Sequence, residues 1–149
     1  MLYAIKRDDG GVNILVISPN TKMPLDDILK KDIPQGAEYR LIESDQLPQD
    51  RLFRNAWTDD NATATVDVDM VKARGIHMQR VRIMRDKKLK ELDAEQMKVL
   101  TDVGQLQDIE RLKKIFRDIP QLLDLSQIDI VEDLIKAWPV ELDKPREYI

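Results

Sequence analysis

Short β-rich runs occupy the first part of the chain and predict a small sheet. Residues 2–5 and 12–17 are mostly aliphatic and β-branched, as strands are. The Asp-Asp-Gly-Gly sequence at residues 8–11 lies between them and predicts a tight hairpin, because glycine adopts the positive φ that such turns need. The same patterns predict one helical turn at residues 24–29, a third strand at 38–42, and a last strand or extended arm at 65–68.

A helical period replaces this pattern near Asp69, whose side chain is a suitable N-cap. We expect a helix over residues 69–92, about 36 Å long at about 1.5 Å per residue. Because a small β-rich region cannot cover that length, part of the helix should meet another helix or another chain. Its apolar side chains recur at steps of three to five residues: Val81, Met84, Leu89 and Leu92.

Two shorter helices are expected after a break at residues 101–104. The first covers residues 105–117, carries Leu106, Ile109, Leu112 and Phe116 on one face, and ends at Pro120.

The second covers residues 130–137 and ends at a Trp-Pro pair. Its cap is Ser126 or Asp129, and Asp129 with Glu132 has the spacing of a capping box. The tail over residues 143–149 is expected to fray. The predicted fold is therefore α+β: a small β-rich N-terminal region (1–68), followed by a helical C-terminal region (69–149) that forms a hairpin with one long basic helix.

Composition removes several kinds of chemistry. The chain has no cysteine and one histidine, His77, which excludes disulfides, thiolate zinc sites and multi-histidine metal sites. Residues 59–70 are rich in carboxylates but do not fit a calcium loop, because Ala64 stands where glycine is needed and Met70 where a bidentate glutamate is needed. No glycine-rich phosphate loop or hydrolase motif is present. We therefore expect a protein that is not an enzyme and binds no cofactor or metal.

The same reading indicates a protein outside membranes. No apolar run approaches the roughly 20 residues that cross a bilayer, and the first residues lack the pattern of a secretory signal.

Charge is the strongest local anomaly. The net charge is -4, yet the segment from Lys72 to Lys90 holds eight basic residues and one acid, Asp86. This segment could be a solvated helix face, a site for an acidic protein partner, or a nucleic-acid site. Nucleic acid is the least favoured, because no aromatic side chain interleaves the cations and the whole chain is acidic. The predicted partner-binding cations are Arg80, Arg82, Arg85 and Lys88.

Four aromatic residues are candidate core anchors: Phe53, Trp57, Phe116 and Trp138. Trp138 has a second interpretation, because a tryptophan in a short helix near the end of the chain can be the hot spot of an interface. We therefore add it to the predicted partner-binding residues.

Several short motifs follow one another in a fixed order between about Tyr39 and Pro139. They are Leu-Phe-Arg-Asn-Ala-Trp at residues 52–57, Val-Asp-Val-Asp at 66–69, a basic helix over 73–93, Phe-Arg-Asp-Ile-Pro at 116–120, and Trp-Pro at 138–139. This order resembles the small tail fibre assembly or tail assembly chaperone proteins of tailed bacteriophages and prophages. After Pro120 this chain lacks the Gly-Phe-Pro-like turn of such proteins and has residues 121–137 instead.

The resemblance implies a non-catalytic protein that binds tail fibre or another tail protein in the host cytoplasm during virion assembly. An alternative is a structural component that stays in the virion tail. A nucleic-acid-binding or inhibitory module is a third, less favoured interpretation. The long helix also allows a homo-oligomer, in which a second copy covers it.

Overall fold

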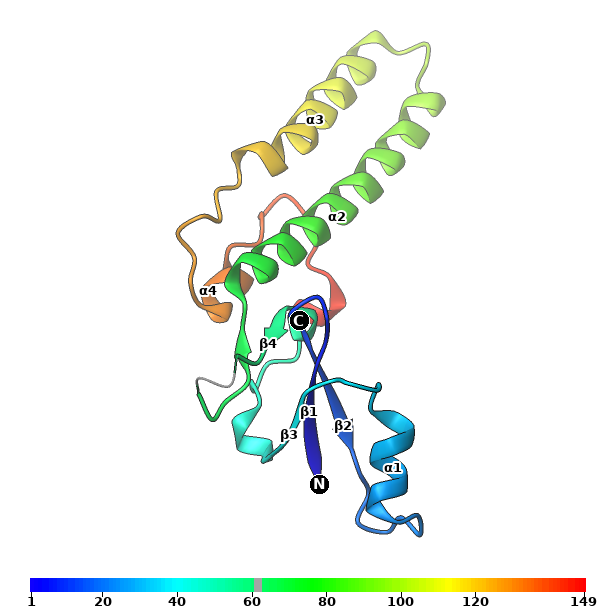
Figure 1. Cartoon of the computed structure of the whole chain (residues 1–149). Helices are drawn as coiled ribbons and strands as arrows, with labels where there is room; N and C mark the ends of the chain where they lie inside the picture. The colour runs from blue at the N-terminus through cyan, green and yellow to red at the C-terminus, as the bar shows by residue number, and fades with distance from the viewer. Residues whose placement is uncertain (61–62) are drawn as a thin grey trace. The chain divides into compact units, whose positions relative to one another are not determined.

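The computed structural model describes residues 1–60 and 63–149, which form two compact units, Met1–Lys72 and Ala73–Ile149. The predicted α+β class is confirmed: a small β-rich region is followed by helices, including a hairpin of two long ones (Figure 1).

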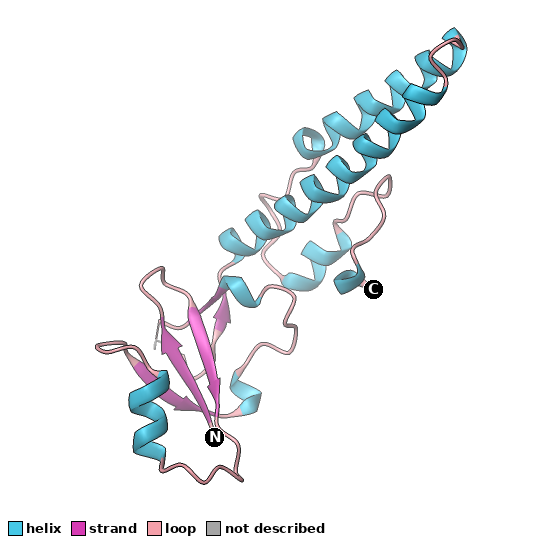
Figure 2. Ribbon diagram, turned by 90° about the vertical axis from the view of Figure 1, so that its right-hand side faces the viewer, coloured by secondary structure: helices cyan, strands magenta, loops and turns pink. Residues whose placement is uncertain are grey.

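The N-terminal unit contains a three-stranded antiparallel sheet in the order β2-β1-β3, formed by Val12–Val16, Leu2–Lys6 and Tyr39–Ile42 (Figure 2). The predicted hairpin is confirmed. Gly10 has a φ of 77°, and its N–H donates to the carbonyl of Arg7 over 3.0 Å. The three predicted strands therefore all pair, with β1 in the centre.

Each face of this sheet packs against a different part of the unit. On one face Tyr3 and Ile17 contact Ile28 of α1 (Leu25–Asp32), a helix longer than the single turn expected at residues 24–29. On the other face the sheet residues Ala4, Val12 and Ile42 form a core with Trp57 and Val66, which come from the segment after β3.

The segment over the second face is mostly irregular. It contains two short 3-10 helices, η1 (Ser44–Gln46) and η2 (Arg54–Ala56). A two-stranded ladder follows, in which β4 (Trp57–Thr58) pairs with β5 (Asp67–Val68). The sequence predicted a strand near β5 but not its partner β4.

The C-terminal unit is built from α2 (Met70–Lys98), whose first residues belong to the other unit, α3 (Val103–Leu122), α4 (Val131–Lys136) and a final 3-10 helix, η3 (Arg146–Tyr148). Both views show α2 and α3 side by side (Figures 1 and 2). The predicted N-cap of α2 is confirmed, because Asp69 Oδ1 accepts from the backbone N–H groups of Val71 and Lys72.

Lys113 of α3 ties the hairpin together. Only 4% of this residue is exposed, and its Nζ lies 2.7 Å from Asp93 Oδ1 and donates to Gln96 Oε1, both on α2. Glu110 lies 3.8 Å away on the same helix as the lysine. A buried ammonium group must find such partners, because burial without them is costly.

Three predicted helix boundaries are wrong. α2 ends at Lys98 rather than at residue 92, because no helix-breaking residue follows Leu92 within α2. α3 begins at Val103, where Asp102 caps it by accepting from the N–H of Gln105, so Gly104 lies inside the first turn rather than in a break. α3 also continues past Pro120 to Leu122. Proline lacks an N–H, but in the last turn this costs only one backbone hydrogen bond, and the N–H of Leu123 closes the turn on Ile119.

The end of the chain also differs from expectation. The capping box predicted from Asp129 and Glu132 does not form, because the residue before α4 is Ile130 and Asp129 Oδ1 accepts from Arg74 Nη1 over 3.2 Å. The tail does not fray: residues 146–148 form η3, and Tyr148 is buried. The sequence lacks a periodic pattern there, so only the aromatic contacts described below explain the order.

Candidate interaction surface of the helical unit

The predicted partner-binding residues fall into two groups, and the first surrounds His77. This histidine on α2 is fully buried. Its ring stacks on Tyr148 with centroids 5.5 Å apart and meets the edge of Trp138 at the same centroid distance. Tyr148 and Trp138 also contact each other edge to face at 5.3 Å. This histidine cluster joins α2 to the end of the chain.

Arg80, one turn after His77, closes the cluster. Its Nη1 donates to the hydroxyl of Tyr148 over 3.2 Å, and its guanidinium carbon lies 5.3 Å from the centroid of the tyrosine ring. Arg80 Nε also lies 3.7 Å from a carboxylate oxygen of Glu147. Because a guanidinium group only donates, the tyrosine oxygen accepts from Arg80 and its own hydrogen is available to His77 Nδ1, 2.8 Å away.

This environment favours the neutral imidazole. Burial, and secondly the charge of Arg80, lowers the pKa of His77 from 6.5 to about 4, although a backbone hydrogen bond with Ala137 acts in the opposite direction. At neutral pH the ring is therefore uncharged and enclosed. Its contacts explain how the tail is held, and they offer no access for a substrate.

Trp138 is part of the same packing. Only 5% of it is exposed, and its Nε1 donates to the carbonyl of Leu142 over 3.0 Å. The prediction that it is a core residue is confirmed, as it is for Phe53, Trp57 and Phe116, which are also buried. Its role as an interface hot spot stays a prediction, and a partner would reach the ring only after the tail moved.

The second group of predicted residues lies further along α2. Two of its three cations form ion pairs with neighbouring acids, and the third forms none with another described residue. Arg85 Nη2 lies 2.8 Å from Asp86 Oδ1, and Lys88 Nζ lies 3.2 Å from Glu91 Oε2. Arg82 is exposed and makes no ion pair with another described residue. Arg82 also points to nearly the opposite side of the helix from Arg80, since two residues turn an α-helix by about 200°.

Two further cations resemble Arg82 in their surroundings. Lys87 and Lys90 are exposed on α2, and neither forms an ion pair within the part of the chain that the structure describes. At about 100° per residue, the three side chains fall within about 140° of the helix circumference. We call Arg82, Lys87 and Lys90 the cationic face. Both lysines belong to the basic run at residues 72–90 but are not among the four cations predicted to bind a partner, although a helical projection places them near Arg82.

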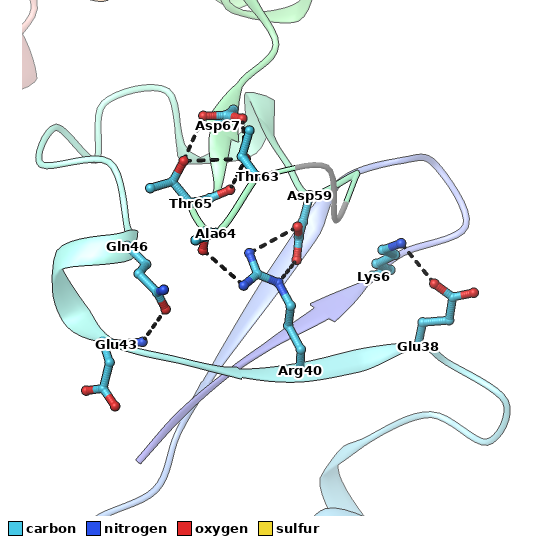
Figure 3. Close-up of polar contacts among 10 residues, drawn as sticks. All are labelled: Lys6, Glu38, Arg40, Glu43, Gln46, Asp59, Thr63, Ala64, Thr65 and Asp67. Atoms are coloured by element: carbon cyan, nitrogen blue, oxygen red, sulfur yellow. Dashed lines mark hydrogen bonds and ion pairs between the residues drawn. The ribbon is translucent and has the colours of Figure 1, made fainter.

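The N-terminal unit holds the other polar cluster of note (Figure 3). Arg40 of β3 forms a two-pronged pair with the buried Asp59, at 2.8 and 3.2 Å, and also donates to the carbonyl of Ala64. Hydrogen bonding to Asp59 raises the pKa of Arg40. Lys6 makes a single ion pair with Glu38, at 2.9 Å. A pocket of about 180 Å³ between these pairs is therefore lined by charges that already have partners.

The carboxylate-rich loop that we compared with a calcium site belongs to this cluster. Asp59 is engaged by Arg40, and Asp67 accepts from Thr63 and Thr65. Residues 61–62 of the loop lie outside the described residues. Among the residues that are described, no group of three or more potential metal ligands comes together.

No protein-family model, curated protein or solved structure matches the chain. Across residues 1–60 and 63–149, no helix is both long enough and apolar enough to cross a bilayer.

Proposed function

We propose that this chain is a non-catalytic tail protein of a bacteriophage, which binds an acidic segment of the tail fibre protein during virion assembly in the host cytoplasm. The phage context comes from the order of motifs between about Tyr39 and Pro139. The mode of binding comes from the cationic face of α2.

The cationic face carries the proposal because none of its three cations forms an ion pair with another described residue, although Asp86 lies between Arg82 and Lys90 on the same side of α2. The acids nearest to it are occupied: Asp86 pairs with Arg85, Glu91 with Lys88, and Asp93 with Lys113. Cations clustered in this way attract an acidic partner and accelerate its association. The three side chains are exposed, so a partner can reach them without opening the fold.

Co-expression of the chain with the fibre protein from the same phage tests the proposal. We expect a complex, and more fibre protein in the soluble fraction than without the chain. A triple charge reversal, Arg82→Glu with Lys87→Glu and Lys90→Glu, should remove both effects.

A matched control reverses three exposed cations that lie elsewhere in the same unit: Lys98, Lys114 and Arg117. This control makes the same change in net charge and should keep the complex. Equal loss in both variants would show that net charge alone matters, and no complex with the unaltered chain would contradict the proposal.

Mass spectrometry of mature particles separates the two tail roles. An assembly factor is absent from the particle, whereas a structural component of the tail remains. Salt-dependent binding of the chain to duplex DNA, lost in the triple reversal, would instead assign the cationic face to nucleic acid.

A further inference from the structure

The outer side of β2 is an unpaired sheet edge in the N-terminal unit. The strand order is β2-β1-β3, so no described strand pairs with β2 on its far side (Figure 1). Met1 and Ile17 exchange backbone hydrogen bonds across β1 and β2, and the N–H of Arg7 donates to Gly11. With pairing in this register, Val12, Ile14 and Val16 direct their backbone N–H and C=O groups outward.

The sequence of this edge is unusual for a strand left without a partner. Edge strands are commonly protected by charges, proline or a bulge. β2 has none of these, since it reads Val-Asn-Ile-Leu-Val and pairs regularly with β1. Val16 is 69% exposed. The edge is therefore suited to accept another strand.

A groove of about 440 Å³ lies beside this edge. Its volume falls within the range of about 300–1,000 Å³ that is typical of ligand sites. Two residues of β2 line it with their side chains, so a strand added to β2 would place its own side chains beside them. The apolar lining consists of Leu2, Ile14, Val16, Leu47, Pro48 and Trp57.

The charged residues at the groove indicate what kind of peptide segment it would bind. Arg51 and Arg54 line it, are exposed, and make no ion pair with another described residue. Asp45 lies on the same lining, so one positive charge remains in excess. Trp57 is 4% exposed, and its Nε1 is buried without a hydrogen-bond acceptor among the described residues. The two exposed cations, against one acid, favour a guest that brings a carboxylate.

We propose that β2 binds an extended segment of a partner protein by strand addition, and that this segment presents an apolar and an acidic side chain to the groove. The two side chains stand two residues apart, because alternate residues of a strand share a face. The apolar one packs on Ile14 and Val16, and the acidic one meets Arg51 and Arg54. A second copy paired through β2 would supply no carboxylate from its own Val12–Val16.

Synthetic peptides test this proposal on the full chain. The first carries isoleucine and glutamate two residues apart in a strand of threonine and serine. The second has the same residues adjacent, and the third has lysine in place of glutamate. In a Trp138→Phe background, Trp57 is the only tryptophan, and its fluorescence reports binding at the groove. The first peptide should bind roughly tenfold more tightly than either of the others.

Variants of the chain separate the two parts of the site. Arg51→Glu with Arg54→Glu should weaken the first peptide roughly tenfold, whereas Lys22→Glu, an exposed change that does not line the groove, should leave it unaffected. Val16→Pro removes an outward N–H without removing a bond to β1, and should abolish binding. Val16→Ile keeps both that N–H and an apolar β-branched side chain, and should retain binding.

Amide exchange decides between this guest and a second copy. The amides of Ile14 and Val16 should exchange rapidly in the free chain and become protected with the first peptide. Protection in the free chain, together with a dimeric mass, would show that a second copy occupies the edge and would overturn the proposal. Equal affinity for all three peptides would also overturn it. The triple reversal of the cationic face should bind the peptide normally, so this inference and the proposed function fail separately.

Discussion

The buried histidine should make the stability of the helical unit depend on pH between about 6.5 and about 4. The pKa of His77 is about 4 in the folded chain and 6.5 without burial. The unfolded chain therefore takes up a proton first as the pH falls. The free energy of unfolding is highest above about pH 6.5, declines as the pH falls, and levels off below about 4, where both states are protonated.

The size of the effect follows from the shift. One pKa unit corresponds to about 1.4 kcal/mol, so the interval from 6.5 to about 4 corresponds to about 3 kcal/mol. This is a large part of the 5–15 kcal/mol or so that stabilises a typical domain.

Denaturant unfolding at several pH values measures this effect. In a Trp57→Phe background, Trp138 is the only tryptophan and lies against the histidine ring, so its fluorescence reports the helical unit. His77→Phe keeps an aromatic ring of similar size but does not titrate. The carboxylates titrate in both chains, so the difference between the two pH profiles isolates His77.

We expect the unaltered histidine chain to lose about 3 kcal/mol more than His77→Phe between pH 6.5 and 4. Parallel profiles for the two chains would refute the reasoning. So would a titration of the His77 ring protons by NMR that gave a pKa near 6.5.

Substitutions at four other positions test the packing and the cap of α2, each by denaturant unfolding. Tyr148→Phe should lower the free energy of unfolding by about 1–3 kcal/mol, because His77 and Arg80 lose the hydroxyl that they contact. An unchanged unfolding midpoint would contradict these hydrogen bonds. Lys113→Ala should cost about 1–3 kcal/mol, because it removes a buried side chain and its contacts with Asp93 and Gln96 on α2, and high salt should not reproduce the whole loss. Asp69→Ala should cost about 1 kcal/mol, whereas Asp69→Asn should keep the cap. Phe116→Ala should cost about 3–5 kcal/mol, and a smaller loss would mean that the ring is not buried.

Local sequence signals predicted most of the fold. The Asp-Asp-Gly-Gly turn identified the β1–β2 hairpin, and Asp69 identified the start of α2, because both features depend on residues next to one another in the chain. The errors arose where distant residues decide the outcome. Asp129 could have capped α4, but Arg74 takes its carboxylate. The tail looked unstructured because the ring that Tyr148 stacks on comes from α2.

The candidate site shows the same division. The sequence showed that the cations lie on one segment, but it could not show which of them form ion pairs or hydrogen bonds in the folded chain. Arg80 is engaged by Tyr148 and Glu147, residues that lie near the end of the chain. Arg85 and Lys88 are paired with acids on α2 itself. Helical spacing separates Arg80 from Arg82, but only the folded structure shows which side is exposed.

Calorimetric titration of the purified chain with the tail fibre protein is the most direct test of the account. We predict binding that weakens as salt rises and weakens by roughly tenfold or more when Arg82, Lys87 and Lys90 are changed to glutamate. The control with Lys98, Lys114 and Arg117 changed to glutamate should keep the affinity of the unaltered chain. Binding that depends on neither salt nor the cationic face, or no heat of binding at all, would contradict the central claim that this surface recognises an acidic partner.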